Sequence, residues 1–339
     1  MKELREKKTI RSLLLLLLPV AAAIVCMGIG RVSIKPTEIV RSLYRIVVYG
    51  AQSVDGQIYS VLIRVRLPRI LLAALCGAGL SVSGNAFQSI FSNALATPDT
   101  LGVSAGASFG AALALLLGAD LFTVQMSGLA MGFLAVALTY FISNRKGRLS
   151  VIMMVLAGMV VASLFEAGLS VIKYVADPDS TLPSITFWLM GSLANVSYGN
   201  LAIAAPFILG GILIIYLMRW KLNILSLQED EAKAMGVNLY AMRMVISLAA
   251  TMITAACVSL CGQVGWVGLL IPHISRMLFG NNNRDVVPAS ISLGAVFLLL
   301  IDTLARAATS VELPISILTA FIGAPIFILL LRRTGGIEA

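Results

Sequence analysis

Long windows without a single charged residue restrict the fold of this chain more than any other feature. The clearest are residues 12–30, 70–98, 100–119, 121–144, 149–165, 180–218, 244–275, 286–301 and 313–331. A helix needs about 20 predominantly apolar residues to cross a bilayer, so most of these windows fit one crossing. The windows at 180–218 and 244–275 are too long for one. Internal glycines, and Pro272 in the second, divide them into an external helix plus a span and into two spans.

This pattern predicts an all-α membrane protein with about ten transmembrane helices. The expected spans are about 11–30, 69–92, 100–118, 122–143, 149–175, 200–219, 240–261, 265–280, 286–305 and 314–332. The composition agrees, because 59% of the 339 residues are hydrophobic and only 12% are charged. These values exclude a soluble enzyme, a disordered chain and a nucleic-acid-binding protein.

The basic residues indicate how the chain is oriented in the membrane. With the N-terminus inside, 16 of the 25 lysines and arginines fall in cytoplasmic segments, as the positive-inside rule requires. We therefore expect both termini to be cytoplasmic. Seven of the nine exceptions lie between Arg31 and Arg69, so an outward-facing basic cluster needs an explanation from topology or function.

The counts of metal-binding and nucleotide-binding residues exclude several kinds of site. The chain has one histidine, His273, and four cysteines without paired spacing, which argues against a zinc site, a haem site or a disulfide framework. No GxxxxGK[ST] phosphate loop occurs. We expect no cofactor in this chain and no ATPase site of its own.

One polar segment on the predicted cytoplasmic side has helical character. Residues 225–235 form a short amphipathic pattern that ends at Gly236. Such a helix either lies on the membrane surface or receives a cytoplasmic partner. The second interpretation is favoured, because the chain has no other sizeable cytoplasmic segment.

Three arginines are candidates for binding carboxylates at the outer membrane edge. Arg66 and Arg69 share one helix face at the start of the second span, and Arg306 lies at the outer end of the ninth. Guanidinium groups on rigid helix ends suit bidentate capture of carboxylates. Two alternatives remain: snorkelling to lipid phosphate, and an intrahelical pair between Asp302 and Arg306.

Glu166 is the candidate for a pathway residue. It lies in the fifth predicted span, about 24 Å along the helix, and an intramembrane carboxylate is a functional suspect. Broken, Gly- and Pro-rich segments at 70–106 and 244–280 occupy corresponding places in the two halves, which suggests a weak internal repeat. An ion-coupled secondary transporter using Glu166 or Asp302 is the alternative function. An intramembrane enzyme is disfavoured, since no catalytic constellation occurs at mid-depth.

Several motifs resemble those of the FecCD-type permeases, the membrane subunits of ATP-driven importers for iron–siderophore complexes, haem and cobalamin. They are RLPR (66–69), the Gly77/Gly84 span, NALATPDTLGVSAGA (93–107), LAG (156–158), the segment 222–236, GWVGLLIPHISR (265–276), DTLAR (302–306) and residues 312–333. The resemblance covers nearly the whole chain after residue 60. Ala94 stands where the family commonly has proline.

The resemblance implies that residues 1–339 form one transmembrane domain with a type II ABC importer permease fold, in a bacterial or archaeal plasma membrane. It also implies four kinds of partner: a second permease subunit, identical or paralogous, two ATPase subunits that bind ATP and Mg, an extracytoplasmic substrate-binding protein, and the lipid bilayer.

The resemblance also assigns roles to individual residues. Docking of the binding protein would fall to Arg66, Arg69 and Arg306. The cytoplasmic gate would consist of Asn93, Leu95, Ser150 and Val151. Coupling to the ATPases would use the helix at about 225–236, with Leu225, Glu229, Ala232, Met235 and Gly236.

Overall fold

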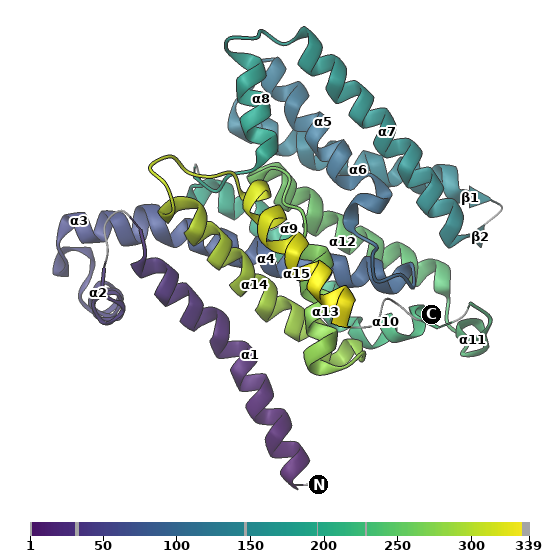
Figure 1. Cartoon of the computed structure of the whole chain (residues 1–339), viewed down its shortest axis with the longest axis horizontal. Helices are drawn as coiled ribbons and strands as arrows, with labels where there is room; N and C mark the ends of the chain where they lie inside the picture. The colour runs from purple at the N-terminus through teal and green to yellow at the C-terminus, as the bar shows by residue number, and fades with distance from the viewer. Residues whose placement is uncertain (1, 31–33, 146–147, 195, 228, 334–339) are drawn as a thin grey trace.

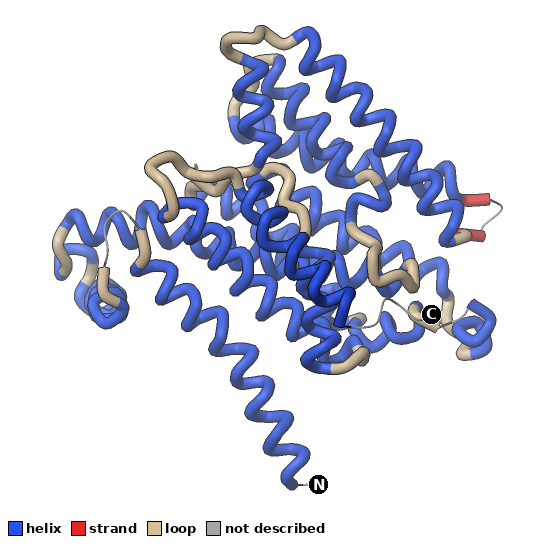
Figure 2. Tube along the Cα trace, in the orientation of Figure 1, coloured by secondary structure: helices blue, strands red, loops and turns tan. Residues whose placement is uncertain are grey.

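The computed structural model describes residues 2–30, 34–145, 148–194, 196–227 and 229–333. This part of the chain is almost entirely helical (Figures 1 and 2), which confirms the all-α prediction. The longer helices are α1 (Lys2–Gly28), α2 (Pro36–Tyr49), α4 (Leu67–Ile90), α5 (Val103–Leu116), α6 (Leu121–Ser143), α7 (Val151–Val175), α8 (Thr181–Met190), α9 (Tyr198–Leu217), α12 (Leu239–Cys261), α13 (Val267–Phe279), α14 (Asn283–Ala307) and α15 (Ile315–Arg333). The short elements are η1 (Ala51–Ser53), α3 (Gly56–Tyr59), η2 (Ser60–Arg66), η3 (Pro98–Leu101), β1 (Asn144–Arg145), β2 (Arg148–Leu149), α10 (Arg219–Leu225) and α11 (Glu229–Ala234).

The helices surround α4, which lies at the centre of the bundle. It contacts α9, α12, α13 and α14, and 83% of the most apolar stretch of the helix that contains it is buried, compared with 17% for α1. Small residues allow this close packing. A Cβ on Gly77 would lie 2.1 Å from the carbonyl oxygen of Gly294 in α14, so the two backbones touch directly.

Hydroxyl groups on α4 add specific contacts to this packing. Ser81 Oγ donates to the carbonyl oxygen of Ser290 in α14 at 2.6 Å, and Ser83 Oγ lies 2.8 Å from Thr254 Oγ1 in α12. Such interhelical hydrogen bonds hold helices together where lipid replaces water. The central position of α4 therefore rests on small residues and on short polar side chains.

Each predicted span overlaps one helix, but several ends differ from the expectation. The second span was expected to begin near residue 69, whereas the helix runs without a break from Gly56 to Ile90. Pro68 does not end it, because the π-helical stretch η2 precedes it and Leu67 N donates to Leu62 O, five residues back. The local shift to i→i+5 bonding accommodates the missing N–H of proline.

Seven helical segments of the described residues are long and apolar enough to cross a membrane: residues 11–28, 56–90, 121–143, 151–175, 198–217, 239–261 and 283–307. The apolar helices α5, α8, α13 and α15 are shorter. That α5, α13 and α15 also cross, which would give ten spans, stays a prediction, as does the internal repeat.

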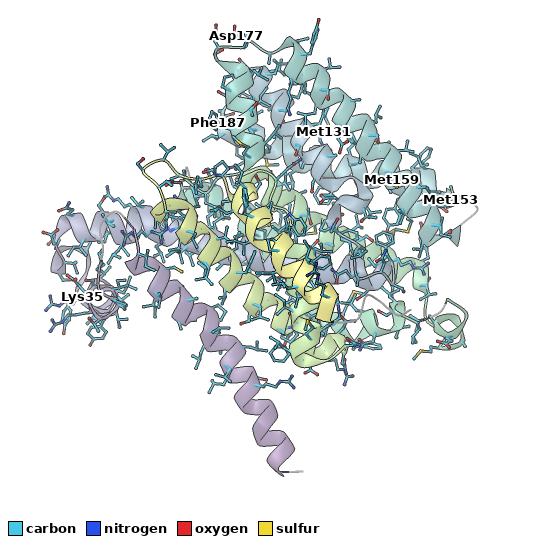
Figure 3. All side chains as sticks on the ribbon, viewed as in Figure 1. Lys35, Met131, Met153, Met159, Asp177 and Phe187 are labelled. Carbon is cyan, nitrogen blue, oxygen red and sulfur yellow. The ribbon has the colours of Figure 1, made fainter. Side chains whose placement is uncertain are left out.

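Two ends of the bundle are distinguished below. The α2 end carries α2, α3 and residues 308–314, whereas the α10 end carries α10, α11 and the β1–β2 hairpin (Figure 1). Lys35, which directly precedes α2, lies on the side of the molecule away from Met153 at the start of α7 (Figure 3).

Candidate functional site

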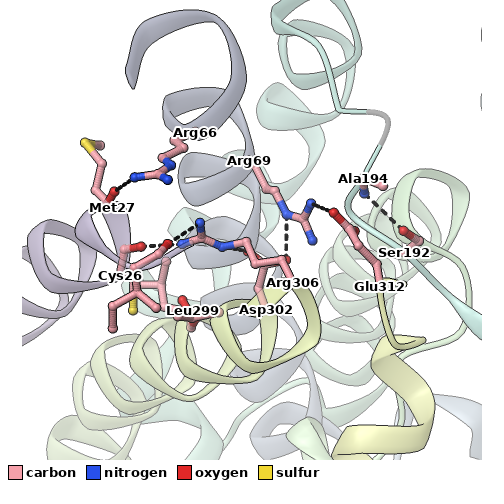
Figure 4. Close-up of polar contacts among 12 residues, drawn as sticks. Cys26, Met27, Arg66, Arg69, Ser192, Ala194, Leu299, Asp302, Arg306 and Glu312 are labelled. Atoms are coloured by element: carbon pink, nitrogen blue, oxygen red, sulfur yellow. Dashed lines mark hydrogen bonds and ion pairs between the residues drawn. The ribbon is translucent and has the colours of Figure 1, made fainter. Parts of the chain in front are cut away.

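The three candidate docking arginines converge at the α2 end, but each is bonded within the chain (Figure 4). Arg69 Nε donates to Asp302 Oδ1 at 2.8 Å, and Arg69 NH1 donates to Glu312 Oε1 at 2.9 Å. Arg306 Nε lies 3.7 Å from Asp302 Oδ2. We refer to Arg66, Arg69, Asp302, Arg306 and Glu312 as the arginine cluster.

Further contacts of the arginine cluster go to the end of α1. Arg66 NH1 donates to Met27 O at 2.5 Å, Arg306 NH1 donates to Ile29 O at 2.6 Å, and Arg306 NH2 donates to Cys26 O. The last carbonyl groups of a helix lack intrahelical partners and carry partial negative charge. Two guanidinium groups therefore cap α1 and fix it to η2 and α14.

Two of the three candidate docking arginines are buried. Arg66 is 6% exposed and Arg69 is 7% exposed. The expected pair between Asp302 and Arg306 is present, but the nearer partner of Asp302 is Arg69. The docking role stays a prediction. Exposed basic residues of the same outer cluster are Lys35, Arg41, Arg45 and Arg64, whereas Arg31 lies outside the described residues.

The predicted gate loop follows α4 at the α10 end and begins with a left-handed residue. Ser92 has φ 47°, and the bonds from Ser92 N to Ser89 O and from Asn93 N to Gln88 O form a Schellman cap. Glycine is preferred at such a position. Asn93 Oδ1 accepts from Leu95 N at 2.9 Å, and Leu95 is exposed. The loop is thus a defined turn with an apolar side chain at its surface.

The gate loop contacts the predicted coupling segment directly. Ser92 Oγ donates to the carbonyl oxygen of Leu225, the last residue of α10, at 3.3 Å. One hydrogen bond therefore connects the loop after α4 to α10. The other two predicted gate residues lie where α7 begins: Ser150 is its N-cap and is exposed, and Val151 is half-buried.

The coupling segment is not the single helix expected at about 225–236. The structure has α10, which begins at Arg219 and ends at Leu225, and then α11. Ser226 Oγ donates to Leu222 O at 3.1 Å, and this side-chain bond competes with continued helix bonding. Leu225 and Ala232 are buried, Met235 is exposed and Gly236 has φ 70°. The side chain of Glu229 lies outside the described residues.

A buried polar network beside the gate loop was not predicted from the sequence. Arg276 NH1 of α13 donates to Asn85 Oδ1 at 3.1 Å, and its NH2 donates to Gln88 Oε1. Asn85 Nδ2 donates to Asn283 Oδ1 at 2.9 Å, and Asn283 N donates to Asn223 Oδ1 of α10 at 2.8 Å. The network joins α4, α13, α14 and α10. Two amides at i and i+3 within an apolar run were the signal in the sequence.

Helix α7 exposes an apolar stripe along its length. Its members are Ile152, Leu156, Met159, Val160 and Leu164. Figure 3 marks Met159 on this helix. Glu166 is also exposed, and so are Ser163 and Ser170, whose helical spacing places them along the same stripe. The stripe has no partner within the described residues.

Comparisons with known proteins agree with this architecture. The sequence pattern of the FecCD transport family matches residues 15–333. The molybdate import system permease protein MolB of Haemophilus influenzae is 41% identical over 314 residues, which cover 92% of this chain and 92% of that protein. The hemin transport system permease protein HmuU of Yersinia pestis is 33% identical over 287 residues, 83% of this chain and 86% of that protein.

A solved structure has the same fold along nearly the whole chain. It is an inward-facing conformation of a metal-chelate type ABC transporter, with a TM-score of 0.85 and 39% sequence identity, and the match covers 95% of this chain and 98% of that one. These matches confirm the family that the sequence motifs indicate. The chain therefore belongs to the FecCD transport family and is a multi-span membrane permease of an ATP-binding-cassette importer.

Proposed function

We propose that this permease moves a metal chelate, such as an iron–siderophore complex, haem or cobalamin, from an extracytoplasmic binding protein into the cytoplasm. A second permease subunit completes the pathway, and two ATPase subunits bind ATP and Mg and drive the cycle. The protein lies in a bacterial or archaeal plasma membrane with both termini cytoplasmic, so the α2 end faces outward. Family membership leaves the ion-coupled alternative without support.

The exposed stripe of α7 is the observation that carries this proposal. A stripe of purely apolar side chains would suit lipid. The exposed stripe also includes Glu166, Ser163 and Ser170, and carboxylates within membrane segments face a protein interior or a water-filled cavity. We therefore assign the stripe to the contact with the second permease and to the wall of the pathway between them, with Glu166 on that wall.

The contact between Ser92 and Leu225 supports a mechanical link from the ATPases to the gate. In the proposed cycle, movement of the ATPases displaces α10 and α11. The loop with Asn93 and Leu95 follows, because Ser92 Oγ bonds to Leu225 O. Ser150 and Val151 complete the gate at the start of α7.

Removal of the Ser92 hydroxyl tests this link. We expect both Ser92→Ala and Ser92→Gly to lower uptake per ATP hydrolysed by up to about fivefold, because one hydrogen bond contributes about 1 kcal/mol. The measurement is chelate uptake together with phosphate release in proteoliposomes. The two variants control for backbone strain, since glycine tolerates φ 47° better than alanine. If uptake per ATP hydrolysed is unchanged in both variants, the bond between Ser92 and Leu225 does not connect the ATPases to the gate.

Docking of the binding protein is proposed for the α2 end. Arg66, Arg69 and Arg306 form its positive centre, with the side chains of Arg69 and Arg306 each 9% exposed. The exposed Arg41, Arg45 and Arg64 extend the positive surface. Acidic residues on the binding protein are the complementary chemistry.

The cargo class follows from the side chains along the proposed pathway wall. The exposed α7 stripe combines apolar residues, two serines and one carboxylate, and none of its exposed members is basic. Lys173, seven residues after Glu166, is half-buried. An oxyanion gains nothing from such a wall, whereas a bulky chelate can slide along it. Molybdate is the second candidate, favoured by the 41% identical relative.

Reconstitution tests the proposed function as a whole. The permease, its ATPase subunits and its binding protein are placed in proteoliposomes, and accumulation of a ferric siderophore, hemin, cobalamin and molybdate is measured. We expect ATP-dependent uptake of one of the chelates and no uptake when the binding protein is omitted. Uphill transport by the permease without its partners would contradict the proposal. Uptake of molybdate and of none of the chelates would identify molybdate as the cargo.

A further inference from the structure

A groove at the α10 end lies on the side of the bundle away from α7. It has a volume of about 1200 Å³ and opens between α1, the end of α9, α10 and the start of α14. Its apolar walls include Leu15, Leu16, Pro19, Leu217 and Ile291. In Figure 1, α1 and α7 lie on opposite sides of the central helices, so the groove is separate from the proposed pathway.

Three arginines surround the mouth of this groove. They are Arg11 at the start of the apolar part of α1, Arg219 at the start of α10, and Arg284 in the first turn of α14. One acidic residue, Asp285, also lines it. The net charge of these four side chains is positive, which favours an anionic ligand at the mouth.

Arg11 and Arg219 are held in place, and each retains N–H donors without a partner among the described residues. Arg11 NH2 donates to Leu278 O at 3.1 Å, and its guanidinium lies 4.5 Å from the ring centroid of Phe279. Arg219 NH1 donates to Tyr216 O at 2.6 Å, and its guanidinium lies 4.0 Å from the Tyr216 ring centroid. An arginine carries five N–H donors. Each of these bonds uses one of them, which leaves donors for a phosphate group.

A polar atom without a partner lies deeper in the groove. Ser292 lines the groove and is 3% exposed, and its Oγ has no hydrogen-bond partner among the described residues. It lies eight residues after Arg284 on α14, about 12 Å further along the helix. Buried hydroxyl groups in native proteins are normally bonded. The groove therefore offers a hydroxyl to a ligand below its basic mouth.

We propose that this groove binds an anionic phospholipid. The phosphate group lies among Arg11, Arg219 and Arg284, an ester oxygen accepts from Ser292 Oγ, and an acyl chain occupies the apolar part beside Leu16. Trp220 is exposed at the same level, as is typical of aromatic residues at the membrane–water interface. Free phosphate would leave the apolar walls unused, which is why a lipid fits the whole groove. Basic pockets between transmembrane helices are known to bind such headgroups.

The test is lipid retention by the complete transporter. The complex is purified with its ATPases, placed in nanodiscs of phosphatidylcholine that contain a minor fraction of phosphatidylglycerol, released into mild detergent and analysed by native mass spectrometry. We expect selective retention of phosphatidylglycerol by the wild type. In the triple variant Arg11→Gln, Arg219→Gln, Arg284→Gln, retention falls at least about tenfold, since each basic side chain near the headgroup contributes to binding.

Two further variants make the result specific. The triple variant Arg41→Gln, Arg45→Gln, Arg64→Gln removes the same number of exposed charges at the α2 end and keeps wild-type retention. Leu16→Trp fills the groove from a position that is 69% exposed, so it leaves the core intact and displaces the lipid. Equal retention by all variants, equal retention of phosphatidylcholine, or a lipid-free groove in the assembled complex would overturn the proposal.

Discussion

Replacement of Asp302 by alanine is expected to lower the free energy of unfolding by about 3–5 kcal/mol. Asp302 is 1% exposed and bonds to Arg69 at 2.8 Å, with Arg306 at 3.7 Å. Its removal leaves two largely buried guanidinium groups without their shared carboxylate. Arg306 also holds the carbonyl groups at the end of α1, so the change loosens the attachment of that helix. The measurement is thermal or denaturant-induced unfolding of the purified permease in detergent.

Glu312→Ala is the matched control for this prediction. Glu312 also bonds to Arg69, but its side chain is 35% exposed, and ion pairs in contact with solvent contribute about 1 kcal/mol or less. The double variant Arg69→Met, Asp302→Leu should be less harmful than the sum of its parts, because it removes both charges of the close pair. Equal destabilisation by Asp302→Ala and Glu312→Ala would show that the cluster is not a buried ionic contact.

The membrane spans could be predicted from the sequence because the bilayer imposes a simple rule. A segment without charges and of sufficient length has to satisfy its backbone hydrogen bonds internally, which makes it a helix. The ends of the helices follow a different rule. The helix Gly56–Ile90 continues outward past Pro68, because the π-helical stretch before Pro68 removes the need for the N–H that proline lacks. The hydrophobic periodicity of the sequence does not predict this stretch.

The arginine cluster could be predicted only in part. The spacing of Asp302 and Arg306 on one helix gave their pair directly. The bonds from Arg69 to Glu312 and from Arg306 to the end of α1 join residues more than 200 positions apart, so they depend on the tertiary fold. The same reason hid the network of Asn85, Arg276 and Asn283. The sequence motifs identified the arginines of the cluster, but they did not indicate which residues these arginines bond to in the fold.

The coupling segment differs from the predicted single helix for another reason. Its amphipathic spacing was consistent with one helix from residue 225 to 236, but the fold ends α10 at Leu225, where Ser226 caps it and Ser92 bonds to its last carbonyl group. Serine competes for backbone bonds wherever the tertiary structure offers it the geometry. The break therefore falls where Ser226 and Ser92 both bond to carbonyl groups of α10.

Gly84→Ala is expected to destabilise the bundle by about 3 kcal/mol, at the upper end of the range for overpacked cores. A Cβ on Gly84 would lie 1.9 Å from the carbonyl oxygen of Gly268 and 2.5 Å from its Cα. Both obstacles are backbone atoms, so no side-chain rotation relieves the clash and α4 has to separate from α13. The measurement is the same unfolding experiment, supported by the yield of folded permease after purification.

Gly210→Ala provides the matched comparison, because it makes the same change within another membrane helix. A Cβ on Gly210 would meet only Met252 Cε, at 3.7 Å, which is an ordinary contact. Alanine is the better helix former by about 1 kcal/mol, so Gly210→Ala should be neutral or stabilising. If Gly84→Ala behaves like Gly210→Ala, direct backbone contact between α4 and α13 does not exist in the folded protein. If only Gly84→Ala unfolds, the packing of small residues around α4 determines how closely the central helices approach.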